Sequence, residues 1–476
     1  MAEPKKYLAF SRRLVMVGFG SIGQGVLPLI LRHLEIAPDR IEILSPDESG
    51  RPVAEEYGVL FRAVALTPDN YRAELEPRLG PGDFLLNLSV DVSSIVLFSF
   101  AAERGALYLD TCIEPWPGGY TDASVPAAQR TNYALREQAL AAGRALGPGA
   151  PTAVLTHGAN PGMVSHFVKQ ALLDIARDTG AEAAPPVDRA GWAALSRRLG
   201  VKVIHVAERD TQVPTTPKRP GEFVNTWSVE GFFSEGCQPA ELGWGSHEKA
   251  LPPDGRRHES GSDAAIYLLR PGASTRVRTW TPLAGPIDAF LITHNESISL
   301  ADYLTVREPG GSGALYRPTV HYAYHPCDAA VLSVHELSGR QWQMQESKRL
   351  IVEEVQPGGI DELGVLLCGH ARNAYWYGSR LSVDEARALA PHNNATSLQV
   401  TIPVLAGLIW ACENPARGLV EPEELDHERI LEICRPYLGP VVGVYGDWTP
   451  LDRRETLFAE DLDREDPWQF KNVRIV

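Results

Sequence analysis

The sequence predicts an α/β protein with a doubly wound parallel sheet domain and an inserted α+β substrate domain that has a mixed sheet. Two observations predict this fold. A short apolar segment at 13–17 (RLVMV) leads directly into GFGSIG at 18–23, which is typical of a strand, a glycine turn and a helix. From 159 to about 389 the chain becomes rich in Gly, Pro and Trp, with short strand-like segments. The first domain is therefore expected to be Rossmann-like.

The first unit of that domain consists of a strand at 13–17, a helix at 24–34 and a second strand at 40–44. In this context the GxGxxG pattern indicates a dinucleotide site. Asp47 follows the second strand and is expected to bind the adenosine ribose, which favours NAD over NADP because a carboxylate repels a 2′-phosphate. The alternative is that the strand ends early and leaves Asp47 on a mobile loop.

Each glycine of the turn has its own expected task. Gly18 permits the tight turn, Gly20 lets the backbone approach a pyrophosphate, and Gly23 lets the helix pack close to the strand. The pyrophosphate is expected at the helix N-terminus, next to Ser21 and Ile22, because free N–H groups and the helix dipole favour an anion there.

The alternation of strands and helices continues, with strands at 83–89 and 106–111 and a helix between them at 93–104. Ligands of open doubly wound sheets bind outside the carboxyl ends of the strands. The residues expected there are Ser89, Asp91, Thr111 and Glu114. Later elements are a helix at 130–146, a linker at 147–151, a strand at 152–156, a turn through Asn160 and Pro161, and a helix at 163–175.

The expected domains are an NAD-binding Rossmann domain at 1–158, completed by C-terminal helices at about 390–476, and a catalytic domain at 159–389. Strands of the catalytic domain are expected at 201–207, 264–269, 289–293 and 320–324. The segment 395–412 is long and apolar, but Thr396, Ser397, Gln399 and Thr401 indicate a core helix and not a membrane span.

Composition limits the partners. The net charge is −15, with 60 acidic and 45 basic residues and no basic cluster, so nucleic acid is not expected to bind. A negative field favours a cationic small molecule, although solubility alone also explains this charge. The N-terminus has no signal-peptide pattern and the six cysteines form no CxxC pair. We therefore expect a cytoplasmic protein without membrane contact.

Candidate chemistry gathers in the segment 222–249, where Trp227, Phe232, Phe233 and Trp244 alternate with Glu230, Glu235, Glu241 and Glu248. Aromatic faces and carboxylates together can bind an alkylammonium ion, whereas the alternative is that the aromatics are core and the glutamates surface. His294 can move protons near neutral pH or serve as a structural hydrogen bonder. The segment 321–335 contains His, Cys and Asp at a spacing that fits no zinc pattern, so no metal is expected.

Six motifs resemble the bacterial homospermidine synthases, within the wider saccharopine-dehydrogenase-like group. They are GFGSIGQG, DTCIEPW, THGANPGMVSHFVKQAL, NTWSVEGFFSEGCQPAELGWGSHEK, TPLAGPIDAFLITHNESISLADYL and HYAYHPCDAAVLSVHEL. The resemblance implies that NAD⁺ takes a hydride from putrescine, that the imine loses ammonia, and that a second putrescine forms a Schiff base which the retained cofactor reduces to homospermidine. It also implies a homodimer and use of putrescine or related diamines.

The resemblance assigns roles to residues of these motifs and of two further matching segments, HVAERD with Glu208 and SVDVSS with Asp91. Trp227 is expected to be an aromatic platform for the cationic substrate, and Glu208 and Glu235 are expected to bind the amines. The other expected site residues are Asp91 and Glu114 near the pocket entrance or reacting end, and Asn160 and His294 beside the nicotinamide and substrate.

Two other functions compete with this one. A saccharopine- or carboxyspermidine-type dehydrogenase would hold a substrate carboxylate and would need arginines, whereas the sharp motifs here are rich in Glu and Trp. A non-catalytic NAD-binding protein would bind the cofactor without turnover.

Overall fold

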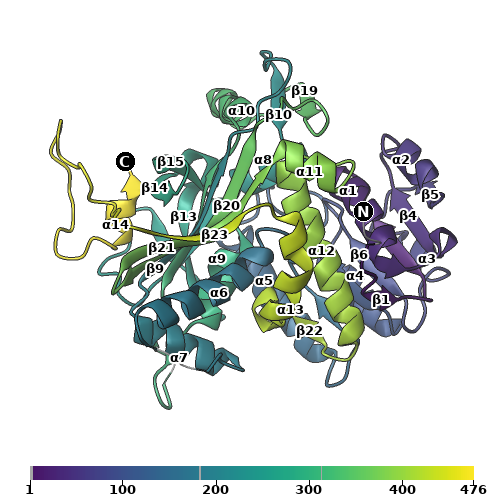
Figure 1. Ribbon diagram of the computed structural model, residues 1–476, viewed down its shortest axis with the longest axis horizontal. Helices are drawn as coiled ribbons and strands as arrows, with labels where there is room; N and C mark the ends of the chain where they lie inside the picture. Colours follow the sequence, from purple (N-terminus) through teal and green to yellow (C-terminus); the bar gives the residue numbers. More distant parts are fainter. Residues whose placement is uncertain (1–3, 182–183, 312) are drawn as a thin grey trace.

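The computed structural model describes residues 4–181, 184–311 and 313–476. Two sheets organise the chain, a parallel sheet built mostly from the N-terminal part and a mixed sheet built from the middle (Figure 1). Helix α12 (Ala395–Glu413) contacts α1 and β7 on the N-terminal side and β20 and β21 of the mixed sheet. This helix therefore joins the two halves.

The N-terminal sheet has the strand order β22-β8-β7-β6-β2-β4-β5 among the described residues, and all of its pairs are parallel. Its strands are β2 (Leu14–Val17), β4 (Ile41–Ser45), β5 (Leu60–Ala63), β6 (Phe84–Asn87), β7 (Leu107–Asp110), β8 (Ala153–Val154) and β22 (Leu419–Val420). Sequence order runs outward from β2 in both directions. The predicted doubly wound parallel sheet is thus confirmed.

The helices of this half are α1 (Ser21–His33), α2 (Arg51–Glu56), α3 (Tyr71–Leu75), α4 (Ser94–Glu103) and α5 (Asn132–Ala145). Helix α1 begins at Ser21, three residues before the predicted start at 24, because Gly20 already serves as its N-cap. The glycine turn is correspondingly shorter than expected, and the helix N-terminus lies nearer to the end of β2.

The chain returns to the N-terminal sheet near its end. Strand β22 pairs in parallel with β8, so residues 419–420 form an edge of a sheet whose other strands precede residue 155. Helix α12 is long and apolar enough to span a membrane by composition, but 89% of its apolar window is buried inside the fold. It is a core helix, as predicted. The exact division into domains stays a prediction.

The mixed sheet has the order β12-β13-β11-β18-β9-β20-β21-β23 among the described residues, with β15, β14 and β24 continuing from β18. Its strands are β9 (Val203–Asp210), β11 (Pro239–Gly243), β12 (Gly255–Arg257), β13 (Ala265–Pro271), β14 (Arg276–Thr281), β15 (Gly285–Ile292), β18 (Thr319–His325), β20 (Ile360–His370), β21 (Asn373–Ser382), β23 (Val441–Gly446) and β24 (Arg474–Ile475). Strands β9 and β18 are parallel, and the others pair antiparallel. The mixed sheet is confirmed, although the long hairpin β20–β21 was not predicted.

The remaining helices cover or flank this sheet. They are α6 (Met163–Asp178), α7 (Arg189–Leu199), α8 (Val229–Cys237), α9 (Asn295–Tyr303), α10 (Asp328–Gly339), α11 (Val383–Leu389), α13 (His427–Cys434) and α14 (Phe470–Val473). Smaller pairs are β1 (Leu8–Ala9) with β3 (Leu34–Glu35), β10 (Glu222–Asn225) with β19 (Ser347–Leu350), and β16 (Val306–Arg307) with β17 (Ala314–Tyr316). Three of these helices, α6, α8 and α9, begin close to predicted site residues.

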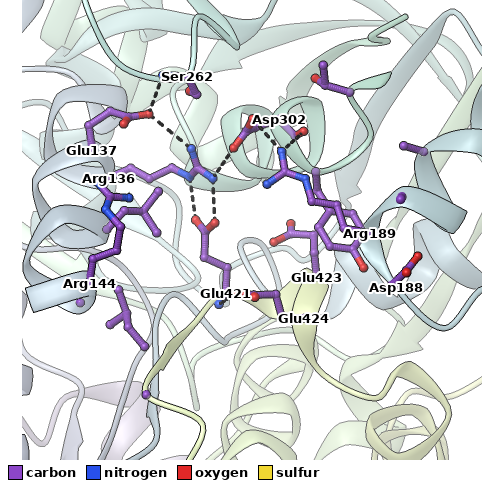
Figure 2. Close-up of a pocket in the computed structure, with 18 of the residues that line it drawn as sticks. Arg136, Glu137, Arg144, Asp188, Arg189, Ser262, Asp302, Glu421, Glu423 and Glu424 are labelled. Carbon is purple, nitrogen blue, oxygen red and sulfur yellow. Dashed lines mark hydrogen bonds and ion pairs between the residues drawn. The ribbon is translucent and has the colours of Figure 1, made fainter. Parts of the chain in front are cut away.

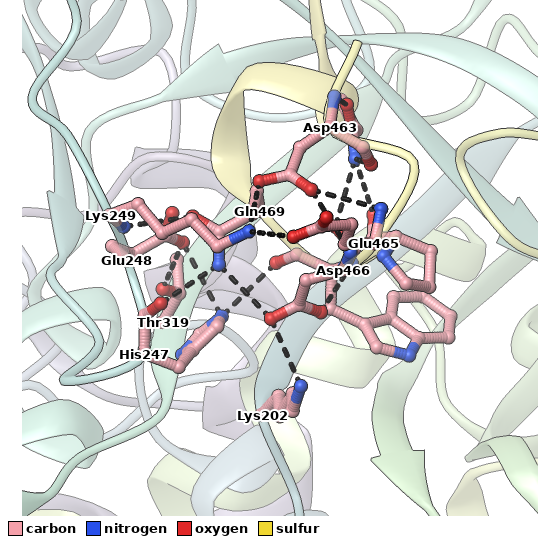
Figure 3. A network of polar contacts seen from close by, with 12 residues as sticks. Lys202, His247, Glu248, Lys249, Thr319, Asp463, Glu465, Asp466 and Gln469 are labelled. Carbon is pink, nitrogen blue, oxygen red and sulfur yellow. Dashed lines mark hydrogen bonds and ion pairs between the residues drawn. The ribbon is translucent and has the colours of Figure 1, made fainter.

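The C-terminal segment 447–476 folds back onto the mixed sheet, where β24 pairs with β14 (Figure 1). Figure 3 shows the polar network that fastens it. Asp466 accepts a hydrogen bond from Lys202 Nζ at 3.0 Å, and the Phe470 N–H donates to Glu248 Oε2 at 3.0 Å. Trp448 and Trp468 are buried in the core on this side of the sheet. Glu248 thus has a structural partner and is not part of a substrate site.

Candidate active site

The glycine turn after β2 combines two tightly packed positions with one open position. A Cβ on Gly18, whose φ is +85°, would lie 2.7 Å from the Leu88 carbonyl carbon. A Cβ on Gly23 would lie 2.9 Å from Phe19 Cδ2. A Cβ on Gly20 would have nothing within 4 Å. Gly18 and Gly23 are therefore needed for packing, whereas Gly20 faces space that a ligand can fill.

The N-terminus of α1 points at this space. Gly20 is its N-cap and has no side-chain cap, so the first amides of the helix, beginning at Ser21 and Ile22, lack side-chain acceptors. Ser89 and Thr111 follow β6 and β7 and are half-buried. Free helix amides bind anions. The turn therefore fits the pyrophosphate of a dinucleotide, which is the group that the sequence predicts here.

Asp47 lies two residues beyond the end of β4 and is exposed. Its carboxylate accepts hydrogen bonds from the Ser49 N–H at 2.9 Å and from Ser49 Oγ at 2.8 Å. The residue is thus on a loop, as the alternative interpretation had it, but Ser49 orients its carboxylate. Its contact with the ribose stays a prediction.

A small cavity lies where the glycine-rich half meets the mixed sheet. Its lining includes four predicted site residues, Glu114, Pro161, Glu235 and His294. The other residues that line it are Cys112, Tyr120, Asn132, Ser234, Gln238 and Asn295. The segment after β7, the end of α8 and the start of α9 thus contribute to one space.

His294 lies at the N-cap of α9 between two carboxylates. Its Nε2 is 3.1 Å from Glu235 Oε2, and its Nδ1 is 3.2 Å from Glu296 Oε1. Burial lowers the pKa of this imidazole, but the two carboxylates outweigh burial and raise the pKa to about 10. His294 is therefore an imidazolium at neutral pH, with both N–H groups donated.

Glu208, near the end of β9, is 2% exposed and hydrogen-bonded on one oxygen. Asn160 Nδ2 donates to its Oε2 at 3.2 Å and the Tyr322 hydroxyl donates at 2.7 Å. The Tyr322 ring lies 4.4 Å from the His294 ring. Burial raises the pKa of Glu208 to about 8, despite the hydrogen bond from Tyr322. This carboxyl can gain and lose a proton near neutral pH.

Asp91 and Glu114 meet on the N-terminal side of the cavity. The Asp91 N–H donates to Glu114 Oε2 at 3.3 Å, and the Cys112 thiol donates to Oε1 at 3.2 Å. Glu114 is buried, and burial raises its pKa to about 8. Asp91 is exposed. Asp91 is therefore assigned to the rim of the cavity and Glu114 to its wall.

Trp227 is half-buried beside the site but does not line the small cavity. Its Nε1–H donates to the Tyr324 hydroxyl at 3.0 Å, and its ring packs 5.6 Å from that of Phe232. Tyr324 in turn stacks on Tyr322 at 5.1 Å. A layer of aromatic rings therefore connects Trp227 with Tyr322, which donates a hydrogen bond to Glu208.

The segment 222–249 does not form one cluster, which corrects the interpretation of all its aromatics and glutamates as a single site. Glu235 reaches the cavity, but Glu241 accepts hydrogen bonds from the backbone N–H groups of Asn132 at 2.6 Å and Tyr133 at 3.2 Å at the start of α5. Trp244 packs with Phe470 in a separate core. The chain diverges because β11 carries it from the end of α8 into the mixed sheet.

Sequence reasoning missed two groups that touch the predicted residues, Tyr322 and Glu296. Tyr322 bonds Glu208, and Glu296 bonds His294. A signal existed for each. Tyr322 alternates with Tyr324 in HYAYH, which places both rings on one face of a strand, and Glu296 is two residues from His294 in THNES.

Two other features lie outside this site. Among residues 4–181, 184–311 and 313–476, no group of three or more His, Cys, Asp or Glu side chains is placed to hold a metal ion. A larger cavity of about 1230 Å³ borders α5, α7 and α9, and Figure 2 shows its charged side chains. Arg136 there pairs with Glu421 and Asp302, and Arg189 also pairs with Asp302, so these charges neutralise one another.

Two family models match this chain. The family model described as saccharopine dehydrogenase NADP binding domain matches residues 14–154. The model described as saccharopine dehydrogenase C-terminal domain matches residues 158–447.

Relatives with closer similarity share one name. Homospermidine synthase from Blastochloris viridis is 57% identical over 465 residues, which is 97% of each chain. Homospermidine synthase from Mesorhizobium japonicum is 54% identical, over 97% of this chain and 96% of its own. The crystal structure of homospermidine synthase from Legionella pneumophila in complex with NAD matches with a TM-score of 0.92 and 49% identity, over 98% of both chains.

Proposed function

The chain belongs to the homospermidine synthase family, and we propose that it joins two putrescine molecules into homospermidine with release of one ammonia. One observation in the site carries the proposal. Glu208, Asn160 and Tyr322 form a hydrogen-bonded group whose tyrosine ring contacts His294, and His294 is bonded to Glu235 in the small cavity.

The cofactor is NAD, which accepts a hydride from an amine-bearing carbon of the substrate and later returns it. The residues proposed to hold it begin with the turn at Gly18, Gly20 and Gly23 and the first amides of α1, which bind the pyrophosphate. Ser89, Thr111, Asn160 and Pro161 are proposed to lie along the nicotinamide half. Asp47 is proposed to bind the ribose and to disfavour a 2′-phosphate.

Substrate recognition is proposed to depend on negative charge and aromatic faces. Asp91 at the rim and Glu235 in the wall attract a diamine cation, and Trp227 provides a ring for cation–π contact. The described residues that line the cavity include no arginine or lysine. A dehydrogenase of the saccharopine type needs such a residue to hold a substrate carboxylate, so the lining favours a diamine.

Proton transfer is proposed for Glu208. A primary amine must lose its proton before its carbon gives up a hydride or its nitrogen attacks an aldehyde. Glu208 has a pKa of about 8, raised by burial, and can accept that proton near neutral pH. His294 keeps its own proton because of Glu235 and Glu296, so its proposed role is to orient Glu235 and to balance charge.

The sequence of bond changes conserves atoms and electrons. Oxidation of the first putrescine gives an imine, which water hydrolyses to an aminoaldehyde and ammonia. The amine of the second putrescine then condenses with the aldehyde, water leaves, and reduction gives the secondary amine. Buried carboxyls such as Glu114 can supply and recover the protons of the hydrolysis step.

We further propose that the protein acts in the cytoplasm as a homodimer and binds neither nucleic acid nor membranes. The net charge of −15 supports the first exclusion, and the burial of α12 supports the second. Sedimentation at several concentrations measures the oligomeric state.

The decisive experiment uses putrescine deuterated at both α-carbons together with a trace of NAD⁺. We expect many turnovers per cofactor, about one ammonia per homospermidine, and deuterium at the new secondary-amine carbon, because the hydride is returned within the site. Solvent hydrogen at that carbon, or cofactor reduction in step with putrescine loss, would instead indicate an ordinary dehydrogenase.

A further inference from the structure

Behind Glu208 lie two more carboxyl groups that the proposed reaction does not use, Asp210 and Asp361. Asp210 is two residues further along β9, so its side chain is on the same face of the sheet as that of Glu208. Asp361, on β20, is the direct register partner of Asp210 across the antiparallel pair. Both aspartates are 0% exposed. Three acidic side chains thus share one buried face.

Asp210 is surrounded by hydrogen-bond donors. Its Oδ1 accepts from the Gln212 backbone N–H at 2.8 Å and from Gln212 Nε2 at 3.1 Å, and its Oδ2 accepts from Thr226 Oγ1 at 2.9 Å. A carboxylate that accepts two or three such bonds is stabilised in its ionised form. Burial raises the pKa of Asp210, but these donors oppose that shift, and the contacts therefore identify Asp210 as the charged member of the pair.

Asp361 has the opposite environment. Its Oδ2 lies 2.5 Å from Thr396 Oγ1, and its Oδ1 is buried without a hydrogen-bond partner among the described residues. An ionised carboxylate with an unpaired buried oxygen is costly, whereas a carboxylic acid needs fewer donors. The contacts therefore favour a protonated Asp361.

Thr396 connects the two aspartates. Its Oγ1 accepts from Gln212 Nε2 at 2.9 Å and lies 3.5 Å from Asp210 Oδ2. A protonated Asp361 can donate to this hydroxyl, and the hydroxyl proton then points towards Asp210. Thr396 is in the first turn of α12, whose N-terminus also favours negative charge here.

Among the residues that the structure describes, no other titratable group forms an ion pair with the side chain of Asp210 or Asp361. Arg209 is on the same strand, but its guanidinium bonds the Pro326 carbonyl and Asp328. The groups that face the aspartates or interact with them electrostatically are Glu208 and Arg209 on β9, Tyr324 on β18, Cys327 and Asp328 at the start of α10, and Thr396 on α12. Burial first, and then Glu208 and Asp210, raise the pKa of Asp361 well above its ordinary value.

We propose that Asp361 holds a proton shared with ionised Asp210 across β9 and β20, and that this pair fixes the charge behind Glu208 during amine chemistry. The inference rests on the proposed function of Glu208. Asp210 and Asp361 are positioning residues, because they act through Glu208 and not on the substrate. A fixed negative charge at Asp210 keeps Glu208 from ionising too easily, so Glu208 remains able to hold and release a proton near neutral pH.

Two isosteric variants separate the roles of the aspartates. Asp361→Asn mimics the protonated acid, so the pH profile of kcat/KM for putrescine should stay within about 0.3 pH unit of the wild type. Asp210→Asn removes the charge, so the limb that reports Glu208 should move to lower pH by about one unit. A shift in Asp361→Asn alone would place the charge on Asp361 instead. Equal shifts in both variants, or an unmoved limb in Asp210→Asn, would overturn the proposal.

An infrared difference spectrum tests the proton directly, without turnover. Wild type minus Asp361→Asn at neutral pH should show the C=O band of a protonated carboxylic acid, and wild type minus Asp210→Asn should not. Absence of that band for Asp361 would overturn the proposal. If Asp361→Asn does not fold, Thr396→Val serves as the second variant. This variant should change the frequency of the same C=O band, because the protonated Asp361 loses its hydrogen-bond acceptor. An unchanged band would contradict the proton bridge.

The two proposals fail in different ways. If the wild type forms no homospermidine from putrescine and NAD⁺, the proposed function fails, while the infrared measurement still reports where the proton resides. If homospermidine forms but the band and the pH shift are missing, only the shared proton is wrong.

Discussion

Gly20 is the position at which the cofactor site can be altered with the least effect on the fold. Its Cβ would meet nothing within 4 Å, so Gly20→Leu should fold normally but occupy the place of the pyrophosphate. We expect NAD to raise the Tm of the wild type and to leave the Tm of this variant unchanged. Gly339→Leu, at an equally open site at the end of α10, is the control and should retain the NAD response. A Gly20→Leu protein that binds NAD normally would contradict the assignment.

Trp227 tests the aromatic contact with the substrate. Trp227→Phe keeps a ring with a weaker quadrupole and Trp227→Ala removes it, so kcat/KM for putrescine should fall in the order Trp, Phe, Ala. The full truncation should cost ~0.5–2 kcal/mol of transition-state stabilisation or more. Tyr324→Phe, which removes only the hydrogen bond partner of the indole N–H, is the control and should have a smaller effect. An alanine variant with wild-type kcat/KM would refute the role.

The charge on His294 predicts a pH dependence of stability. Its pKa is raised from 6.5 to about 10, so the stabilisation by Glu235 and Glu296 is complete below pH 6.5 and is lost as pH rises towards 10. The difference in the free energy of unfolding between wild type and His294→Asn should therefore shrink from pH 7 to pH 10, by roughly 1–3 kcal/mol. Denaturant titrations measure it. His335→Asn, at an exposed site on α10, should show no such trend, and a constant difference for His294 would contradict the imidazolium.

At the scale of elements, Asn394 fixes the start of α12 and the loop that carries Trp227. Its Oδ1 caps the Ser397 N–H at 2.7 Å, and its Nδ2 donates to the carbonyls of Thr226 at 2.7 Å and Ile351 at 2.9 Å. Asn394→Ala leaves these buried groups unpaired, so the free energy of unfolding should fall by about 2–4 kcal/mol. The control is Ser382→Ala at the cap of α11, which should cost about 1 kcal/mol. Equal losses would show that the carbonyl contacts contribute nothing.

The elements of the N-terminal half were predictable because each carries a local signal. Glycines at 18, 20 and 23 and continuous apolar strands determine the parallel sheet. The hairpin β20–β21 was missed because it contains no such turn signature: its strands are joined by Ala371 and Arg372, and the left-handed Asn373 begins β21. The partner of β8 was also not predictable, since β22 is only two residues long and more than 260 residues away in sequence.

The site residues were predictable from motifs, but their partners were not. Asn160, Glu208 and His294 come from three separate motifs, and only the pairing of β9 with β18 brings Tyr322 between them. Likewise, nothing in the sequence places Asp361 opposite Asp210, because that contact depends on the register of β9 and β20. Local patterns specify residue types, whereas register between distant strands specifies which of them meet.

At the scale of the whole molecule, Arg136 ties three distant parts of the chain together. It is on α5 of the N-terminal half and is 2% exposed. Its Nε and Nη2 bond both oxygens of Glu421, which follows β22, at 2.6 and 2.7 Å. Its Nη2 also bonds Asp302, near the end of α9, at 3.0 Å (Figure 2). Helices α5 and α9 both lead from this network to the small cavity, where Asn132 and Asn295 line the wall.

Removing Arg136 should therefore weaken the contact between the two halves. It should also loosen the walls of the catalytic cavity. Arg136→Met leaves Glu421 without its cation, while Asp302 keeps Arg189, so the free energy of unfolding should fall by about 3–5 kcal/mol. Arg72→Met, which breaks the exposed Arg72–Glu103 pair, is the control and should cost less than about 1 kcal/mol. Denaturant unfolding measures both variants. Below its unfolding transition, Arg136→Met should also show a raised KM for putrescine, because α5 and α9 are no longer held together beside the cavity. A loss no larger than that of Arg72→Met would mean that packing alone joins the halves and that the ion network contributes little.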